Sequence, residues 1–143
     1  MNVFDILGPV MIGPSSSHTA GAARIGRITL ALLGAPAVKA DIFLHGSFAK
    51  TYKGHGTDKA LIAGIMGMST DDSRIRRAPE LAREQGLAVT ITTGDIDGAH
   101  PNTARVALTD ADGNRVSLLG SSIGGGNILV TEVNGMEVSI MGQ

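Results

Sequence analysis

The chain has 143 residues, of which 43% are hydrophobic, and this size and composition favour one domain with a real core. Twelve basic and thirteen acidic residues, without a basic block, argue against nucleic acid and membrane surfaces as partners. No cysteine is present, which excludes a disulfide framework and a thiolate nucleophile, and any cysteine-ligated cluster would need another chain.

The N-terminal sequence has no basic segment followed by an apolar run. No window approaches the roughly 20 apolar residues of a membrane-spanning helix. We therefore expect a cytoplasmic protein.

A polar segment at residues 13–21 precedes the first predicted helix, which runs from Ser17 to about Leu33 with apolar residues at helical spacing. The first turn of a helix has free N–H groups and a partial positive charge, so it suits an anion. The candidate ligands for that anion are Ser15, Ser16, Ser17, His18 and Thr19. The alternative is a serine N-cap without a ligand. Arg24 and Arg27 either point to solvent or add positive charge to this site.

A half-buried strand is predicted from Val38 to His45, because apolar residues alternate there. A second polar, glycine-bearing run follows at residues 45–59, and its Thr57 and Asp58 are predicted to cap a helix that ends near Met66. His55 lies between two glycines, where packing explains it poorly, so we interpret it as a proton-transfer residue. His45 has a simpler interpretation as a hydrogen-bonded residue at a strand end.

The middle of the chain predicts a charged helix at about Arg74–Gln85, capped by residues 71–73, and then a strand at Leu87–Thr93. The following loop contains Asp95, Asp97 and His100. Their spacing fits neither an EF-hand nor a zinc site, so we interpret them as turn residues and expect no metal site in this chain.

Two hairpins are predicted in the C-terminal half, one across residues 110–114 and one across the Asn134-Gly135 turn. The glycine-rich stretch between them, residues 120–127, is either a flexible link or β-bulge, or a nest of backbone N–H groups at Gly124, Gly125 and Gly126. Together these elements predict an α+β fold, with two to three helices packed on a mixed, largely antiparallel sheet.

The three polar motifs, residues 12–21, 46–58 and 124–127, resemble in their order the β chain of iron–sulfur-dependent L-serine dehydratase, and the similarity spans essentially the whole chain. The resemblance implies a cytoplasmic lyase that converts L-serine to pyruvate and ammonia. It also implies a cysteine-bearing α chain as partner, which ligates a four-iron four-sulfur cluster, so that this chain alone binds no cofactor. A homodimer of the isolated chain stays open.

On this resemblance, His55 is the candidate catalytic base or proton relay, with a group of the partner chain as the alternative base. Removal of water from serine needs an acceptor for the Cα proton and a Lewis acid for the hydroxyl, and the cluster implies the second. The residues expected to bind or orient the substrate are Ser15, Ser16, Ser17, His18, Thr19, Lys53, Asp58, Gly124, Gly125, Gly126 and Asn127.

The family usually continues into a small ACT regulatory domain. We expect residues 1–143 to form a single β-chain domain without it. The β-chain domain also resembles the allosteric substrate-binding domain of some D-3-phosphoglycerate dehydrogenases. The competing hypothesis is therefore a non-catalytic domain that binds a small anionic metabolite.

Overall fold

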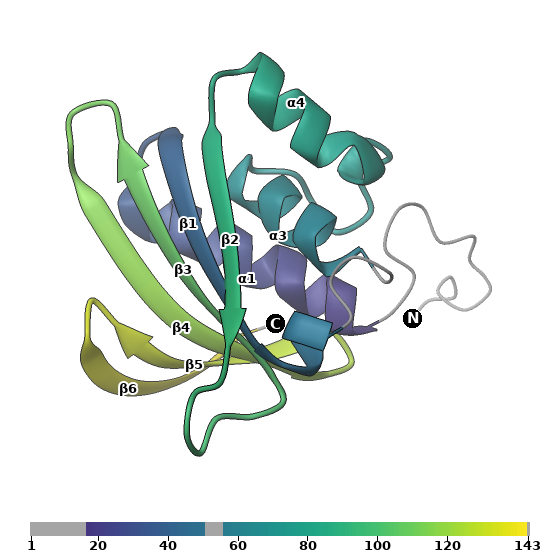
Figure 1. The fold of residues 1–143 in the computed structure, drawn as a ribbon, viewed down its shortest axis with the longest axis vertical. Helices are drawn as coiled ribbons and strands as arrows, with labels where there is room; N and C mark the ends of the chain where they lie inside the picture. Colours follow the sequence, from purple (N-terminus) through teal and green to yellow (C-terminus); the bar gives the residue numbers. More distant parts are fainter. Residues whose placement is uncertain (1–16, 51–55, 143) are drawn as a thin grey trace.

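The structure is a computed structural model that describes residues 17–50 and 56–142. For Ser17 and His18 it describes the backbone alone. Its described part has two layers: a six-stranded sheet and a layer of helices on one face of that sheet (Figure 1). The predicted α+β class, with helices on a mixed and mostly antiparallel sheet, is confirmed.

The main helices are α1 (Ser17–Leu33), α3 (Thr57–Ile65) and α4 (Ala78–Glu84), and residues 47–50 are also helical. The predicted Arg74–Gln85 helix is wrong in its first turn, which is the 3-10 helix η1 (Ile75–Arg77). Pro79 explains the difference. In an α-helix that began at Ile75, residue 79 would donate its N–H to the Ile75 carbonyl, and proline has no N–H. The cap of α3 also differs: its N-cap is Gly56, with φ +77° and no side-chain cap hydrogen bond.

The sheet contains β1 (Ala37–Gly46), β2 (Ala88–Gly94), β3 (Asn102–Asp110), β4 (Arg115–Gly124), β5 (Asn127–Val133) and β6 (Met136–Gly142). Their order across the sheet is β2-β1-β3-β4-β5-β6. β1 and β2 are parallel, with Ile42 opposite Ile91, and every other pair is antiparallel. The helical connection between β1 and β2 permits the parallel pair, since parallel strands need a crossover.

Both predicted hairpins are present. Asp110 closes the β3–β4 turn, because its Oδ1 accepts the N–H groups of Asp112 and Asn114, each at 2.9 Å. The β5–β6 turn has Asn134 at φ +52° and Gly135 at φ +82°, as a two-residue turn of type I′ requires.

The core lies between the sheet and the helices. Alternate residues of β1 and β3 face it, including Ile42, Leu44 and Val106, and all three are nearly inaccessible to solvent. Helices α1 and α3 cross at two glycines: a Cβ on Gly26 would lie 2.5 Å from the Leu61 carbonyl oxygen, and a Cβ on Gly64 would overlap the backbone of Ala23. The two helices therefore pack backbone against backbone.

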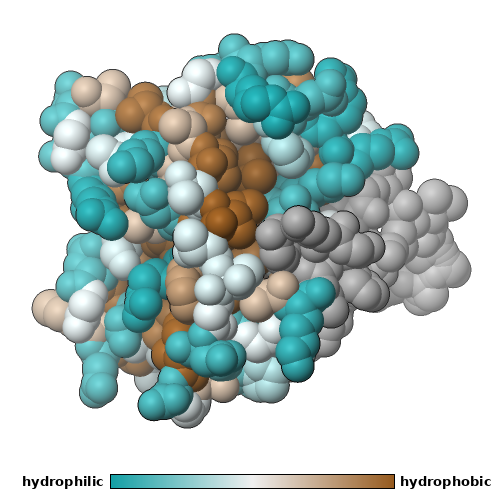
Figure 2. Space-filling view, in the orientation of Figure 1, coloured by the Kyte–Doolittle hydropathy of each residue, from teal (hydrophilic) through white to brown (hydrophobic). Residues whose placement is uncertain are grey.

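The sheet edge formed by β2 has no charged side chain, and its Val89 and Ile91 are half-buried against the core. Figure 2 shows hydrophobic side chains gathered along the middle of this side of the molecule, between hydrophilic surfaces. Across the described ranges, no helix is both long and apolar enough to span a membrane.

Candidate functional site

In the view of Figure 1, the beginning of α1, the beginning of α3 and the turn between β4 and β5 all lie toward one corner of the molecule. Both helices start on the right of this view, and the β4–β5 turn lies below them. The end of β1, with the helical residues 47–50, reaches the same side. Among these segments, α1 packs against α3 and is hydrogen-bonded to the β4–β5 turn.

The glycine-rich stretch is a tight turn between two paired strands. β4 continues through residues 120–124, where the sequence predicted a link, and Gly124 pairs with Asn127 across the turn. The φ angles of Gly124, Gly125 and Gly126 are +102°, +64° and +79°, a conformation that other residues rarely adopt. A register shift between Ser122 and Gly124 also places a bulge here, as one of the two interpretations expected.

The β4–β5 turn is connected to α1 by a hydrogen bond: Nη1 of Arg24 donates to the carbonyl oxygen of Gly126 at 2.9 Å. A Cβ on Gly126 would lie 3.8 Å from the Cβ of Ala20, in ordinary contact. A Cβ on Gly21 would overlap the side chain of Ser122, so the absence of a side chain at Gly21 allows the helix to approach β4.

The predicted substrate residues that the structure describes lie at this corner. The backbones of Ser17 and His18 form the start of α1, and Thr19 follows them, fully buried. Asp58 is the second residue of α3. Its Oδ1 is buried and accepts no hydrogen bond, although an unpaired buried carboxylate oxygen is costly.

Four predicted residues, Ser15, Ser16, Lys53 and His55, lie outside the described residues. Their roles stay predictions from the sequence.

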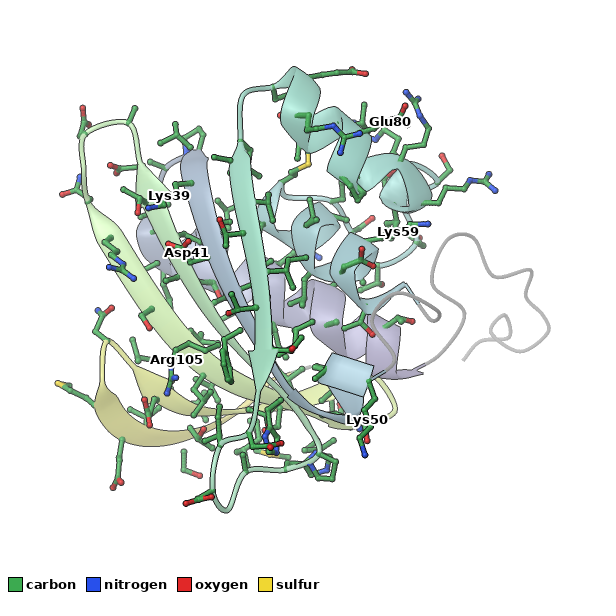
Figure 3. All side chains as sticks on the ribbon, in the orientation of Figure 1. Lys39, Asp41, Lys50, Lys59, Glu80 and Arg105 are labelled. Atoms are coloured by element: carbon green, nitrogen blue, oxygen red, sulfur yellow. The ribbon has the colours of Figure 1, made fainter. Side chains whose placement is uncertain are left out.

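The charge at this corner is mixed. Figure 3 labels Lys50 and Lys59, which extend on the side where α1 and α3 begin. Arg24 is half-buried beside the turn, and Asp58 contributes the negative charge. The N-termini of two helices add partial positive charge at the described part of this corner.

Ser122 is a polar core residue that sequence reasoning passed over. It is fully buried, and its Oγ has no hydrogen-bond partner. The signal was present: β4 alternates Val116, Leu118 and Gly120 on its core face, and the next residue in that alternation is Ser122. It was missed because the strand was predicted to stop at Leu119.

His45 and His100 each accept a hydrogen bond from the backbone in or next to the loop between β2 and β3. Nδ1 of His45 accepts the Ile96 N–H at 2.8 Å, and Nδ1 of His100 accepts the Asn102 N–H at 3.0 Å. Both imidazoles are therefore hydrogen-bond acceptors at Nδ1. Nothing in residues 17–50 and 56–142 groups three or more His, Asp or Glu side chains as a metal site.

An iron–sulfur cluster does not fit this chain's own residues. Cluster irons are held mainly by cysteine thiolates, and the sequence has no cysteine.

Two carboxyl groups away from this corner, those of Asp72 and Asp110, have lowered pKa values. A hydrogen bond from the Arg74 side chain lowers the pKa of Asp72 to about 2. In the β3–β4 turn, the Asn114 side-chain hydrogen bond is the largest cause of the lowered pKa of Asp110. Both carboxylates stabilise local turns.

Comparison with known proteins places this sequence in a family. The family model described as "Serine dehydratase beta chain" matches residues 2–97. The "Probable L-serine dehydratase, beta chain" of Bacillus subtilis (strain 168) is 50% identical over 141 residues, which cover 99% of this chain and 64% of that protein. The "L-serine dehydratase, beta chain" of Peptoniphilus asaccharolyticus is 41% identical over 143 residues, with the same coverage.

A longer relative, the "L-serine dehydratase" of Mycobacterium bovis, is 31% identical over 160 aligned positions, which cover 94% of this chain and 34% of that protein. The chain thus spans 64% of the length of the two β-chain relatives and about a third of the longer one. On the family match and the close similarity to both β chains, this chain belongs to the serine dehydratase beta chain family.

Proposed function

We propose that this chain is the β-chain part of a cytoplasmic L-serine dehydratase, which converts L-serine to pyruvate and ammonia. The observation that carries the proposal is the junction of α1 with the β4–β5 turn, where Arg24 donates to Gly126. A helix N-terminus and a turn without side chains together form a surface that a small carboxylate can approach closely. The names of the two β-chain relatives support L-serine as the substrate.

In this proposal, the carboxylate of L-serine binds to the start of α1 and to the β4–β5 turn. The binding groups are the side chains of Ser15, Ser16, Ser17, His18 and Thr19 with the backbone N–H groups of Gly124, Gly125 and Gly126 and the side chain of Asn127. Hydrogen bonds to a carboxylate are charge-assisted, so several together hold it in one orientation.

His55 is the proposed base for the Cα proton of L-serine, because imidazole titrates near neutral pH. Lys53 and Asp58 are proposed to orient it. Asp58 supports this assignment, since its Oδ1 is buried without a partner and would gain one from an N–H of a neighbouring imidazole or of the substrate.

A cysteine-bearing α chain is the proposed partner, and we assign the four-iron four-sulfur cluster to it. Two facts support the division: this sequence has no cysteine, and the matched region is only about a third of the relative named simply "L-serine dehydratase". A homodimer of the β chain alone is a further proposal, which size-exclusion chromatography of the purified chain tests.

The test is co-expression with the α chain and measurement of serine-dependent pyruvate formation. We expect turnover from the pair, and a loss of at least a hundredfold in kcat for His55→Ala, the scale of general base catalysis. His100→Ala is the comparison for the loss of another imidazole, one that accepts the Asn102 N–H. Retained kcat in His55→Ala removes His55 from the chemistry.

The competing function, a non-catalytic domain that binds a small anion, predicts a different result for this chain paired with the α chain. In that case substitutions at the β4–β5 turn weaken anion binding and leave pyruvate formation unchanged.

A further inference from the structure

Arg24 joins two parts of the molecule that are distant in the chain. It lies in the second turn of α1, while its hydrogen-bond acceptor, Gly126, lies 102 residues later in the β4–β5 turn. The side chain is half-buried, and the 2.9 Å hydrogen bond has a charged donor.

In the β4–β5 turn, strand pairing ends at Gly124 and Asn127, and no side chain of the three glycines holds the turn in shape. Gly124, Gly125 and Gly126 have no side chains to pack, and each has a positive φ. Glycine loses more conformational freedom on ordering than any other residue. A contact on the Gly126 carbonyl therefore restricts the segment whose N–H groups are proposed to bind substrate.

Arg27 provides an internal comparison, because it lies one turn further along α1 and has the same charge. Both arginines line a hollow of about 320 Å³ together with Thr70. Arg27 is exposed, and neither arginine forms an ion pair with an acidic residue in the described ranges. The two residues thus match in charge and differ in the contact with Gly126.

We propose that Arg24 is a positioning residue of the substrate site: its guanidinium holds the β4–β5 turn against α1, so that the turn's N–H groups are ordered before L-serine binds. This inference rests on the proposed function for the identity of the ligand. The contact itself does not, and it can be tested separately.

Turnover is measured with the full chain paired with its α chain, for Arg24→Ala, Arg24→Lys and Arg27→Ala. We expect Arg24→Ala to raise KM for L-serine roughly tenfold, the scale of one charge-assisted hydrogen bond, with a much smaller change in kcat. Arg24→Lys should recover part of the loss, because an ammonium still donates to the carbonyl, and Arg27→Ala should leave KM within about twofold of the unsubstituted pair. Equal KM values for Arg24→Ala and Arg27→Ala overturn the proposal.

Amide hydrogen exchange at residues 124–127 of the same pair supplies a readout that needs no turnover. We expect faster exchange in Arg24→Ala and unchanged exchange in Arg27→Ala. Unchanged exchange in Arg24→Ala overturns the positioning role even where pyruvate forms. Faster exchange in a pair that forms no pyruvate contradicts the proposed function instead, and leaves the contact standing.

Discussion

Gly21 is the residue at which a single methyl group tests the packing of α1 on β4. In Gly21→Ala, the new Cβ would lie 2.7 Å from the Cβ of Ser122 and closer still to its Oγ, whereas ordinary contacts are 3.4–4 Å. Ser122 is fully buried, so its side chain cannot turn out into solvent. Overpacking of this kind costs about 1–3 kcal/mol, against a gain of about 0.5–1 kcal/mol from alanine in a helix. We expect a net loss of about 1–2 kcal/mol in the free energy of unfolding.

Urea unfolding, followed by circular dichroism, measures this loss as a lower midpoint with an unchanged slope. The overlap involves only the side chain of Ser122, so Gly21→Ala should become neutral or stabilising in a Ser122→Gly background. Gly64→Ala is the matched control: its Cβ meets the backbone of Ala23, and it should be additive with Ser122→Gly within about 0.5 kcal/mol. If Gly21→Ala and Ser122→Gly are also additive, the helix and strand are not packed in this way.

Three further variants test other parts of the structure. Ser122→Ala removes a buried hydroxyl without a partner, so we expect unfolding free energy to stay equal or rise by up to about 1 kcal/mol, and a clear loss would reveal a partner for Oγ. NMR titration should give Asp72 a pKa of about 2 that returns toward 3.8 in Arg74→Ala; because the pKa is lower in the folded state, this carboxylate stabilises the fold above about pH 4, and that contribution fades as pH falls toward 2. Asn134→Ala should cost about 1–2 kcal/mol in urea unfolding, since it loses the hydrogen bond from the Ser117 N–H and forces alanine to φ +52°, and Asn134→Gly should cost less.

Local signals in the sequence predicted most elements well. The helix from Ser17 to Leu33 has the predicted ends, because a polar start, helical spacing and Gly34 all act within one segment. The Asn134-Gly135 turn was equally clear, since two successive positive φ angles strongly restrict the residues that fit.

Strand pairing was harder to predict, because it depends on neighbours that are distant in the chain. β4 continues through residues 120–124, although the glycines there have a low propensity for β-strands. Pairing with β3 on one side and β5 on the other outweighs that preference. The position of β1 between β2 and β3 likewise has no signal within β1 itself.

At the candidate site, the sequence indicated which segments carry polar chemistry, and spatial contacts supplied the rest. The choice between a solvated and a functional Arg24 could not be made without its acceptor, the Gly126 carbonyl, 102 residues away. Backbone carbonyls are present at every residue, so no sequence pattern marks the one that a side chain will reach. The unpaired Oδ1 of Asp58 is a similar case, since burial of one atom depends on the whole fold.

The central position of β1 has a consequence for synthesis on the ribosome. Lys39 pairs with Ala88 and with Thr109, roughly 50 and 70 residues later in the chain, so both edges of β1 emerge before either partner exists. The strands from β3 to β6 form a meander of neighbours joined by short turns and can pair as soon as they are made. The nascent chain therefore holds a strand with two unpaired backbone edges until most of the domain has been translated.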